Sequence, residues 1–222
     1  MGSKQEIAEK LFEFIHPPRP EGIFIDAFGG GGAMSLVAKH RGFYRVIYND
    51  KSTIVSKFFD DTIHRREPYR KWVSREEYER SKYKDAYVGI IYGFKNNMNN
   101  SYLYSRDLEV FAKAAHEVLV YNSWELWELL GLCNIESPSP QKLEKEISRA
   151  CGKNFKLWHY SYLKRLNAVP VVDRGEIEVC SMDYKALPVE DLNSVLYLDP
   201  PPMQIQGDMV QRALIQMSYM SG

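Results

Sequence analysis

The chain between residues 5 and 63 alternates amphipathic stretches with short apolar runs. Residues 22–28 and 44–48 are almost wholly apolar, which is typical of strands buried on both faces of a sheet. Apolar residues recur at helical spacing over 5–15, 33–40 and 53–63, and the first stretch places Ile7, Leu11, Phe14 and Ile15 on one face. This alternation predicts the opening of a parallel α/β sheet.

The pattern changes in the middle of the chain. Residues 65–84 are dense in Arg, Lys, Glu and Tyr, and four asparagines fall within 95–101. Helices are predicted over 107–119, 123–130 and 143–150, followed by a basic and aromatic segment over 153–165. Apolar strand patterns return at 176–180 and 194–198. We therefore expect a discontinuous sheet domain, residues 1–63 and 176–222, with residues 64–175 inserted as a mostly helical subdomain.

Composition changes this picture mainly by exclusion. With 222 residues, 45% hydrophobic and 13% aromatic, the chain has enough apolar surface for a buried core. Its net charge is zero, so any nucleic-acid site must be a local patch. Cys133, Cys151 and Cys180 form no disulfide or metal-ligand pattern. The sequence has no signal peptide or membrane-spanning run, so we expect a cytoplasmic protein that binds no membrane and no metal.

Four glycines follow the first predicted strand, in the segment Phe24-Ile-Asp-Ala-Phe-Gly-Gly-Gly-Gly-Ala-Met34. Glycines at this place let a ligand approach the backbone, while the next helix offers free N–H groups. The spacing does not match the dinucleotide fingerprint, because Met34 and Ser35 stand where a third glycine belongs, and the Gly-Lys-Ser/Thr ending of the phosphate-binding loop is absent. A tight turn without a ligand is the alternative. Four consecutive glycines favour a cofactor loop, since each has an entropic cost.

Two carboxylates follow later predicted strands. Asp50 stands about twenty residues beyond the glycines, the offset at which a carboxylate accepts hydrogen bonds from a ribose, although Asn49-Asp50 is also a common turn pair. Asp199 ends the last apolar run and begins Asp199-Pro200-Pro201-Pro202. This motif is either a strand end broken by prolines or a rigid carboxylate at the edge where parallel sheets bind ligands.

Together these motifs resemble the adenine-N6 DNA methyltransferases of the DNA adenine methylase type (D12 class). In that family the target-recognition domain precedes an Asp-Pro-Pro-Tyr motif, as the insert here precedes Asp199. Segments 92–97 and 102–107 are similar to phage and prophage members. The resemblance implies a Rossmann-like sheet that binds S-adenosyl-L-methionine. The residues it assigns to the cofactor are Lys4, Asp26, Phe28, Gly29, Gly30, Gly31, Asp50, Asp183 and Tyr184.

The same resemblance implies how the methyl group is transferred. The target adenine is flipped out of double-stranded DNA. The Asp199 side chain and the Pro200 carbonyl accept hydrogen bonds from its N6 amine, so catalysis is mainly positioning and electrostatics. Pro201 and Pro202 complete the motif, but the family has an aromatic residue where this chain has Pro202. Stacking of a base on an aromatic side chain contributes roughly 1–3 kcal/mol.

The C-terminal part leaves alternatives open. The family continues beyond the catalytic motif with a helix and strands, which residues 203–222 do not resemble. We therefore expect a sheet that is incomplete at the C-terminus, in a truncated or frame-altered member. A second hypothesis is an inactive remnant that retains cofactor or DNA binding. A third is a methyltransferase acting on RNA or protein. A role in restriction-modification and a role in phage self-protection are both open.

Candidate DNA contacts lie in the inserted subdomain, because Arg and Lys anchor phosphates and Asn reads adenine edges. For the cations between residues 65 and 71, the alternative is a solvated helix with ion pairs, because acidic residues interleave with this stretch. These are Glu67, Glu76, Glu77 and Glu79. Residues 153–165 contain no acidic residue and are the better patch. None of the five histidines has a sequence neighbour that suggests a role. The candidates are Arg65, Arg66, Arg70, Lys71, Asn96, Asn97, Asn99, Lys153, Lys156, Lys164 and Arg165.

Overall fold

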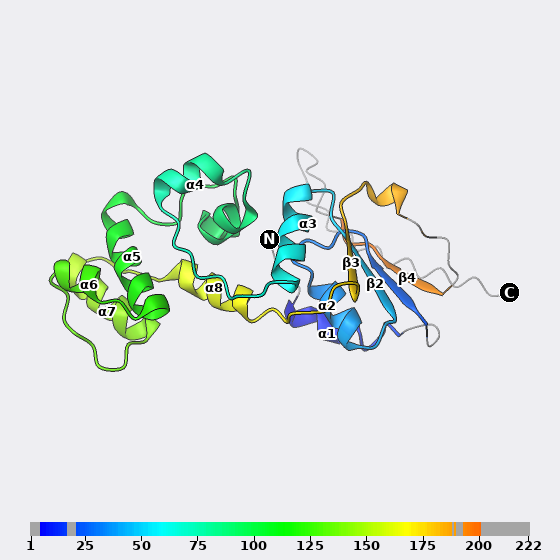
Figure 1. Cartoon of the computed structure of the whole chain (residues 1–222), viewed down its shortest axis with the longest axis horizontal. Coiled ribbons are helices and arrows are strands. Elements are labelled where there is room, and N and C mark those ends of the chain that lie inside the picture. Colours follow the sequence, from blue (N-terminus) through cyan, green and yellow to red (C-terminus); the bar gives the residue numbers. More distant parts are fainter. Residues whose placement is uncertain (1–4, 17–20, 188, 190–192, 201–222) are drawn as a thin grey trace, which may run out of the picture. The chain divides into compact units, whose positions relative to one another are not determined.

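The computed structural model describes residues 5–16, 21–187, 189 and 193–200. The chain divides into two compact units, which are coloured along the sequence in Figure 1. Residues 1–65 and 170–222 form the sheet unit, and residues 66–169 form the helical unit. Each unit is described by itself below.

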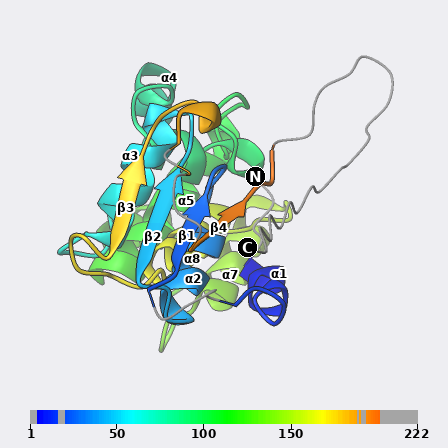
Figure 2. The ribbon, with the colours of Figure 1, turned by 90° about the vertical axis from the view of Figure 1, so that its right-hand side faces the viewer.

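The sheet unit contains four parallel strands in the order β3-β2-β1-β4. They are β1 (Ile23–Asp26), β2 (Arg45–Asn49), β3 (Ile177–Cys180) and β4 (Ser194–Tyr197), and Figure 2 shows them side by side with their arrows in one direction. The register pairs Asp26 with Tyr48 and with Tyr197, and Asn49 with Cys180. The last residues of all four strands therefore lie along one edge of the sheet.

The central strands are buried on both faces, as their apolar runs predict. Phe24 and Val46 are fully buried on one face, and Ile25 and Ile47 are at most 2% exposed on the other. Helix α2 (Ala33–His40) packs against β1 and β2, and α3 (Thr53–Ile63) packs against β3. Both helices have the bounds that the periodicity predicts.

The expected buried face of the first helix is wrong for Ile7 and Phe14. Helix α1 spans Gln5–Leu11, and Ile7 and Phe14 are 50% and 74% exposed. Ile15 is buried as expected, together with Ala8 and Phe12. These three are also at helical spacing, and Phe12 lies 5.2 Å from the Phe24 ring, within an aromatic cluster that only the fold assembles.

The helical unit consists of helices joined by turns. Residues 107–119, 123–130 and 143–150 lie within or close to three of its helices, and most of the basic segment 153–165 lies in a fourth. Trp127 is fully buried beside Trp124, with ring centroids 6.1 Å apart. The elements are α4 (Arg75–Ser81), η1 (Tyr87–Ile91), η2 (Phe94–Asn96), α5 (Arg106–Tyr121), α6 (Glu125–Leu129), α7 (Pro140–Cys151) and α8 (Trp158–Asn167).

Candidate cofactor site and nucleic-acid contacts

The glycine loop joins β1 to α2 and turns tightly. The Gly29 N–H donates to the Asn49 carbonyl at 2.7 Å, and the Gly32 N–H donates to the Gly29 carbonyl at 2.8 Å. Gly30 and Gly32 have φ of 51° and 73°, which disfavour other residues. A Cβ at Gly32 would lie 1.9 Å from the Phe59 ring, whereas one at Gly31 would meet no described atom within 4 Å. Gly32 is thus required by packing, and Gly31 leaves the backbone open to a ligand.

Asp50 connects this loop to the next helix. Its Oδ2 accepts the Gly30 N–H at 3.1 Å and its Oδ1 accepts the Ser52 N–H at 2.8 Å. Ser52 is the N-cap of α3, where its hydroxyl accepts the Val55 N–H. An ionised carboxylate has about four acceptor positions. Two remain for further donors such as the hydroxyls of a ribose.

Asn49 positions the neighbouring turn, a role that the sequence did not suggest. Its side chain is 1% exposed, and its Nδ2 donates to the carbonyls of Ala27 and Met182, both at 3.1 Å. Its Oδ1 accepts the Met182 N–H at 3.0 Å. Because these partners follow β1 and β3, Asn49 holds the ends of two non-adjacent strands together. Interpreting Asn49-Asp50 as a turn pair does not predict the hydrogen bonds of Asn49 to Ala27 and Met182.

Asp183 and Tyr184 follow that turn and start the short helix η3 (Tyr184–Ala186). The Lys185 N–H bonds to the Asp183 carboxylate at 3.1 Å and Lys51 lies 3.4 Å from it, and together they lower the pKa of this carboxyl. The Tyr184 ring is 5.1 Å from the Phe28 ring, tilted by 40°. Tyr184 is 42% exposed, so part of this aromatic pair faces outward.

Asp26 and Tyr48 have internal partners. Asp26 is 1% exposed, and its Oδ2 accepts the Ser35 hydroxyl at 2.8 Å, which ties β1 to α2. The Tyr48 hydroxyl donates to the Gly30 carbonyl at 2.8 Å, and its ring stacks on Phe59 at 4.1 Å. Burial, with Asp50 and Asp26 nearby, raises the pKa of Tyr48 far above its ordinary value. The hydrogen bonds of Asp26 and Tyr48 therefore stabilise the conformation of the glycine loop.

Asp199 and Pro200 follow β4 after one intervening residue, Leu198, and the last residue of β4, Tyr197, pairs with Asp26. Asp26, Asp50, Asp183 and Asp199 thus lie at or just beyond the carboxyl ends of the four strands, where parallel sheets bind ligands. The predicted residues Lys4, Pro201 and Pro202 lie outside the described residues, as do residues 203–222.

A family model described as D12 class N6 adenine-specific DNA methyltransferase matches residues 1–214. The chain belongs to this family. The match extends beyond residue 202, where the resemblance was expected to end. No curated protein matches the chain significantly. Family membership makes the protein a site-specific DNA methyltransferase acting on adenine N6, with S-adenosyl-L-methionine as the family's methyl donor.

Two further observations on this DNA methyltransferase concern only the residues that the structure describes. Within the described residues, no three His, Cys, Asp or Glu side chains gather as a metal site would require. The same part of the chain has no helix with the length and apolar character needed to span a membrane.

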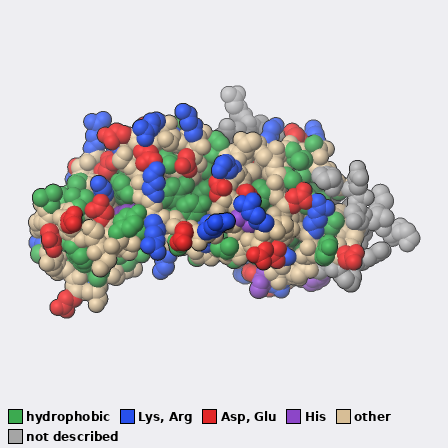
Figure 3. All heavy atoms as spheres, viewed as in Figure 1, with side chains coloured by type: hydrophobic (Ala, Val, Ile, Leu, Met, Phe, Trp, Pro, Cys, Tyr) green, Lys and Arg blue, Asp and Glu red, His purple; other side chains and the backbone are tan. Residues whose placement is uncertain are grey.

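The lysines predicted to contact DNA are largely paired with carboxylates. Lys71 pairs with Glu77, Lys153 with Asp107, and Lys156 with Glu144 at 3.0 Å. The segment 153–165 has no acid of its own, but α5 and α7 supply Asp107 and Glu144. On the face drawn in Figure 3, Lys and Arg side chains are interspersed with Asp and Glu. The methyltransferase therefore has fewer free cations here than the sequence suggests.

Four predicted cations remain exposed with no ion pair to an acidic side chain in the described part of the chain. Two of them, Arg70 and Lys164, line one hollow of about 410 Å³ together with Tyr69, Tyr160 and Asn167. Arg65 lies in the sheet unit, where its guanidinium donates to the Thr62 carbonyl. The four are Arg66, Arg70, Lys164 and Arg165.

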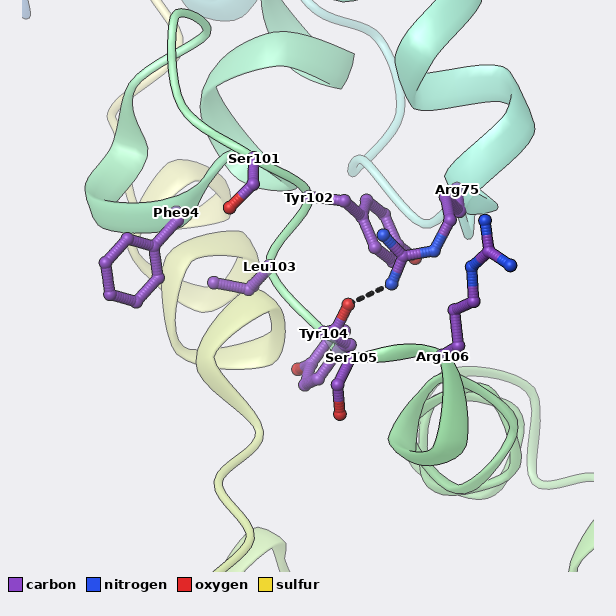
Figure 4. A pocket seen from close by; sticks show the side chains of 8 residues that line it. All are labelled: Arg75, Phe94, Ser101, Tyr102, Leu103, Tyr104, Ser105 and Arg106. Carbon is purple, nitrogen blue, oxygen red and sulfur yellow. Dashed lines mark hydrogen bonds between the residues drawn. The ribbon is translucent and has the colours of Figure 1, made fainter.

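The predicted asparagines surround a turn after η2. Asn97 and Asn99 are exposed, whereas the Asn96 amide donates to the Ile90 carbonyl at 3.3 Å. A second hollow, of about 390 Å³, lies beside this turn (Figure 4). Phe94 borders one side of it and Arg75 borders the other, where the Arg75 guanidinium donates to the Tyr104 carbonyl.

Two histidines have partners that the sequence did not reveal. His116 and His159 are fully buried, and His116 Nδ1 lies 3.1 Å from His159 Nε2. Burial lowers the pKa of His116 to about 4 and lowers that of His159 well below its ordinary value. Their separation of 43 positions explains why no sequence motif shows the pair.

Proposed function

We propose that the carboxyl edge of the sheet binds S-adenosyl-L-methionine and that the helical unit is the target-recognition subdomain, which contacts double-stranded DNA. The observation that carries the cofactor site is the Asp50 carboxylate, which binds Gly30 and Ser52 while keeping acceptor positions for a ribose. The open backbone at Gly31 and the outward-facing pair Phe28 and Tyr184 fit the rest of the cofactor.

Each group at this edge has a distinct role. Asp50 accepts hydrogen bonds from the ribose, Gly29, Gly30 and Gly31 let the cofactor approach the backbone, and Phe28 and Tyr184 pack on its adenine. Asp183, with its carboxyl held ionised by Lys185 and Lys51, lies beside that ring. Lys4 and Asp26 complete the proposed set, Asp26 by holding β1 against α2.

The cofactor, when bound, supplies an electrophilic methyl group. The Asp199 carboxylate and the Pro200 carbonyl accept hydrogen bonds from the N6 amine of a flipped adenine, and Pro201 and Pro202 complete the motif. The amine lone pair is thereby aimed at the methyl carbon. On the helical unit, Arg70 and Lys164 anchor phosphates, and Asn97 and Asn99 face the bases. The segments 92–97 and 102–107 favour a phage-type enzyme.

The test measures cofactor binding and methyl transfer separately. Calorimetry gives the affinity for S-adenosyl-L-methionine, and labelled methyl transfer to unmethylated duplex DNA, with product nucleosides identified, gives activity. Asp50→Asn is expected to weaken cofactor binding, and Asp199→Asn to abolish transfer while binding persists. Asp61→Asn, an exposed carboxylate on α3, is the matched control. Wild-type affinity in Asp50→Asn contradicts the cofactor site, and label in RNA or protein instead of N6-methyladenine contradicts the substrate.

A further inference from the structure

The segment over residues 69–73 crosses the helical unit without joining a helix or a strand. Side chains satisfy its backbone instead. Asn167 bonds both the N–H and the carbonyl of Tyr69, each at 2.8 Å. The Lys71 carbonyl accepts from the hydroxyls of Tyr87 and Tyr92, and the Val73 carbonyl accepts from Tyr102 at 2.7 Å. This segment, which we call the strap, is therefore held in one conformation by the helices around it.

The strap carbonyl of Arg70 is the end point of a buried hydrogen-bond chain. His116 Nε2 lies 2.9 Å from this oxygen, and a carbonyl can only accept, so Nε2 carries the hydrogen. Neutral His116 then has its lone pair on Nδ1, which accepts from His159 Nε2 at 3.1 Å. His159 Nδ1 in turn accepts the Tyr104 hydroxyl at 2.6 Å. Every bond runs in one direction, from Tyr104 to Arg70, and both imidazoles are neutral.

The surroundings favour this neutral arrangement. Trp72 of the strap packs edge-on against His159 at 5.1 Å, and Tyr92, whose ring also contacts Trp72, stacks on His159 at 5.4 Å. The titratable groups facing the two histidines are Tyr92, Tyr104 and Tyr121, and Glu144 of α7 acts on Tyr104. Charging His116 would set its Nδ1–H against the Nε2–H of His159, and charging His159 would remove the lone pair to which the Tyr104 hydroxyl donates.

While its carbonyl is held inside, Arg70 itself is exposed and lines the same hollow as Lys164. The Tyr121 hydroxyl donates to the same carbonyl at 2.8 Å, but Tyr121 is 51% exposed and stands outside the chain of imidazoles. Each of two cations on one hollow can neutralise a phosphate, so both can contribute to DNA binding. The backbone at residue 70 therefore decides where the guanidinium is presented.

We propose that His116 and His159 are positioning residues for DNA binding, because their hydrogen-bond chain holds the Arg70 backbone and thereby keeps the Arg70 guanidinium beside Lys164 as a phosphate contact. This inference rests on the proposed DNA contact of Arg70. It assigns the histidines no part in methyl transfer.

The test is the salt dependence of duplex-DNA binding by the full chain, with S-adenosylhomocysteine present so that no turnover occurs. Each phosphate contact contributes about 0.9 to the slope of log affinity against log salt, or about 3.5-fold in affinity over a fourfold change in salt. Arg70→Ala is expected to lower the slope by about 0.9. His116→Leu is expected to give the same decrease, and the double variant no further decrease. His116→Gln, whose amide can both donate to Arg70 and accept from His159, is expected to keep the wild-type slope.

A purely structural role would give a different pattern, because loss of folded protein lowers the active fraction without changing the slope. Ile147→Val, on α7 in the core of the same unit, controls for this effect and is expected to keep the slope. If His116→Leu does not fold, Tyr104→Phe, which removes the first donor of the chain, takes its place. A wild-type slope in His116→Leu or its substitute, with a lowered slope in Arg70→Ala, overturns this inference. A wild-type slope in Arg70→Ala itself overturns the proposed DNA contact.

Discussion

Acidification should destabilise the helical unit through the buried histidine pair. The pKa of His116 is lowered by burial from 6.5 to about 4, and that of His159 shifts in the same direction. Between these values the unfolded chain binds protons that the folded chain does not. Stability therefore falls as the pH falls from 6.5, until the folded state also takes up the proton.

The magnitude follows from the His116 shift. For one group with pKa values of 6.5 unfolded and about 4 folded, the loss relative to neutral pH is about 2 kcal/mol at about pH 5. His159 adds to this loss. A typical domain has about 5–15 kcal/mol of stability in total, so the effect is large enough to measure.

The assay is urea denaturation at about pH 7.5 and about pH 5, followed by tryptophan fluorescence. All four tryptophans, Trp72, Trp124, Trp127 and Trp158, lie in the helical unit, so the signal reports that unit alone. The remaining histidines, His16, His40 and His64, lie in the sheet unit. His116→Gln cannot take up the proton and should lose about 2 kcal/mol less than the wild type on acidification. Equal losses in the two proteins would refute the reasoning.

Three further predictions concern the cofactor edge and the DNA contacts. Gly32→Ala should lower the melting temperature, because Gly32 has a φ of 73° and an added Cβ would lie 1.9 Å from the Phe59 ring. Gly31→Ala should keep the wild-type melting temperature and weaken cofactor binding, which calorimetry measures. Asn49→Ala should destabilise the sheet unit by about 1–3 kcal/mol for each backbone group left without a partner, seen as lost amide-exchange protection at Met182. Lys164→Ala should lower the slope of log affinity for DNA against log salt by about 0.9. Lys156→Ala should change this slope less, because the Lys156 ammonium already pairs with Glu144. Unchanged slopes in both lysine variants would contradict the assignment.

Local patterns were sufficient for the elements of the sheet unit. Strands β1 and β2 are apolar on both faces, and α2 and α3 repeat at helical spacing, so neighbouring residues alone encode them. Parallel strands place their carboxyl ends at one edge, which is why Asp50 and Asp199 could be expected there from the sequence, whereas Asp26 and Asp183 were assigned by the family resemblance. The glycines could be recognised as a loop, but not sorted into Gly32, which packing requires, and Gly31, which is open.

Contacts between distant segments were decided only by the tertiary structure. The buried face of α1 depends on the cluster of Phe24 and Phe43, and the pairing of Lys153 and Lys156 depends on where α5 and α7 place Asp107 and Glu144. The hydrogen-bond chain from Tyr104 to Arg70 spans separations of 55, 43 and 46 positions along the sequence. Periodicity and motif spacing describe residues that are neighbours along the chain. Partners brought together by packing leave no such local pattern, because their proximity depends on the burial of many other side chains at once.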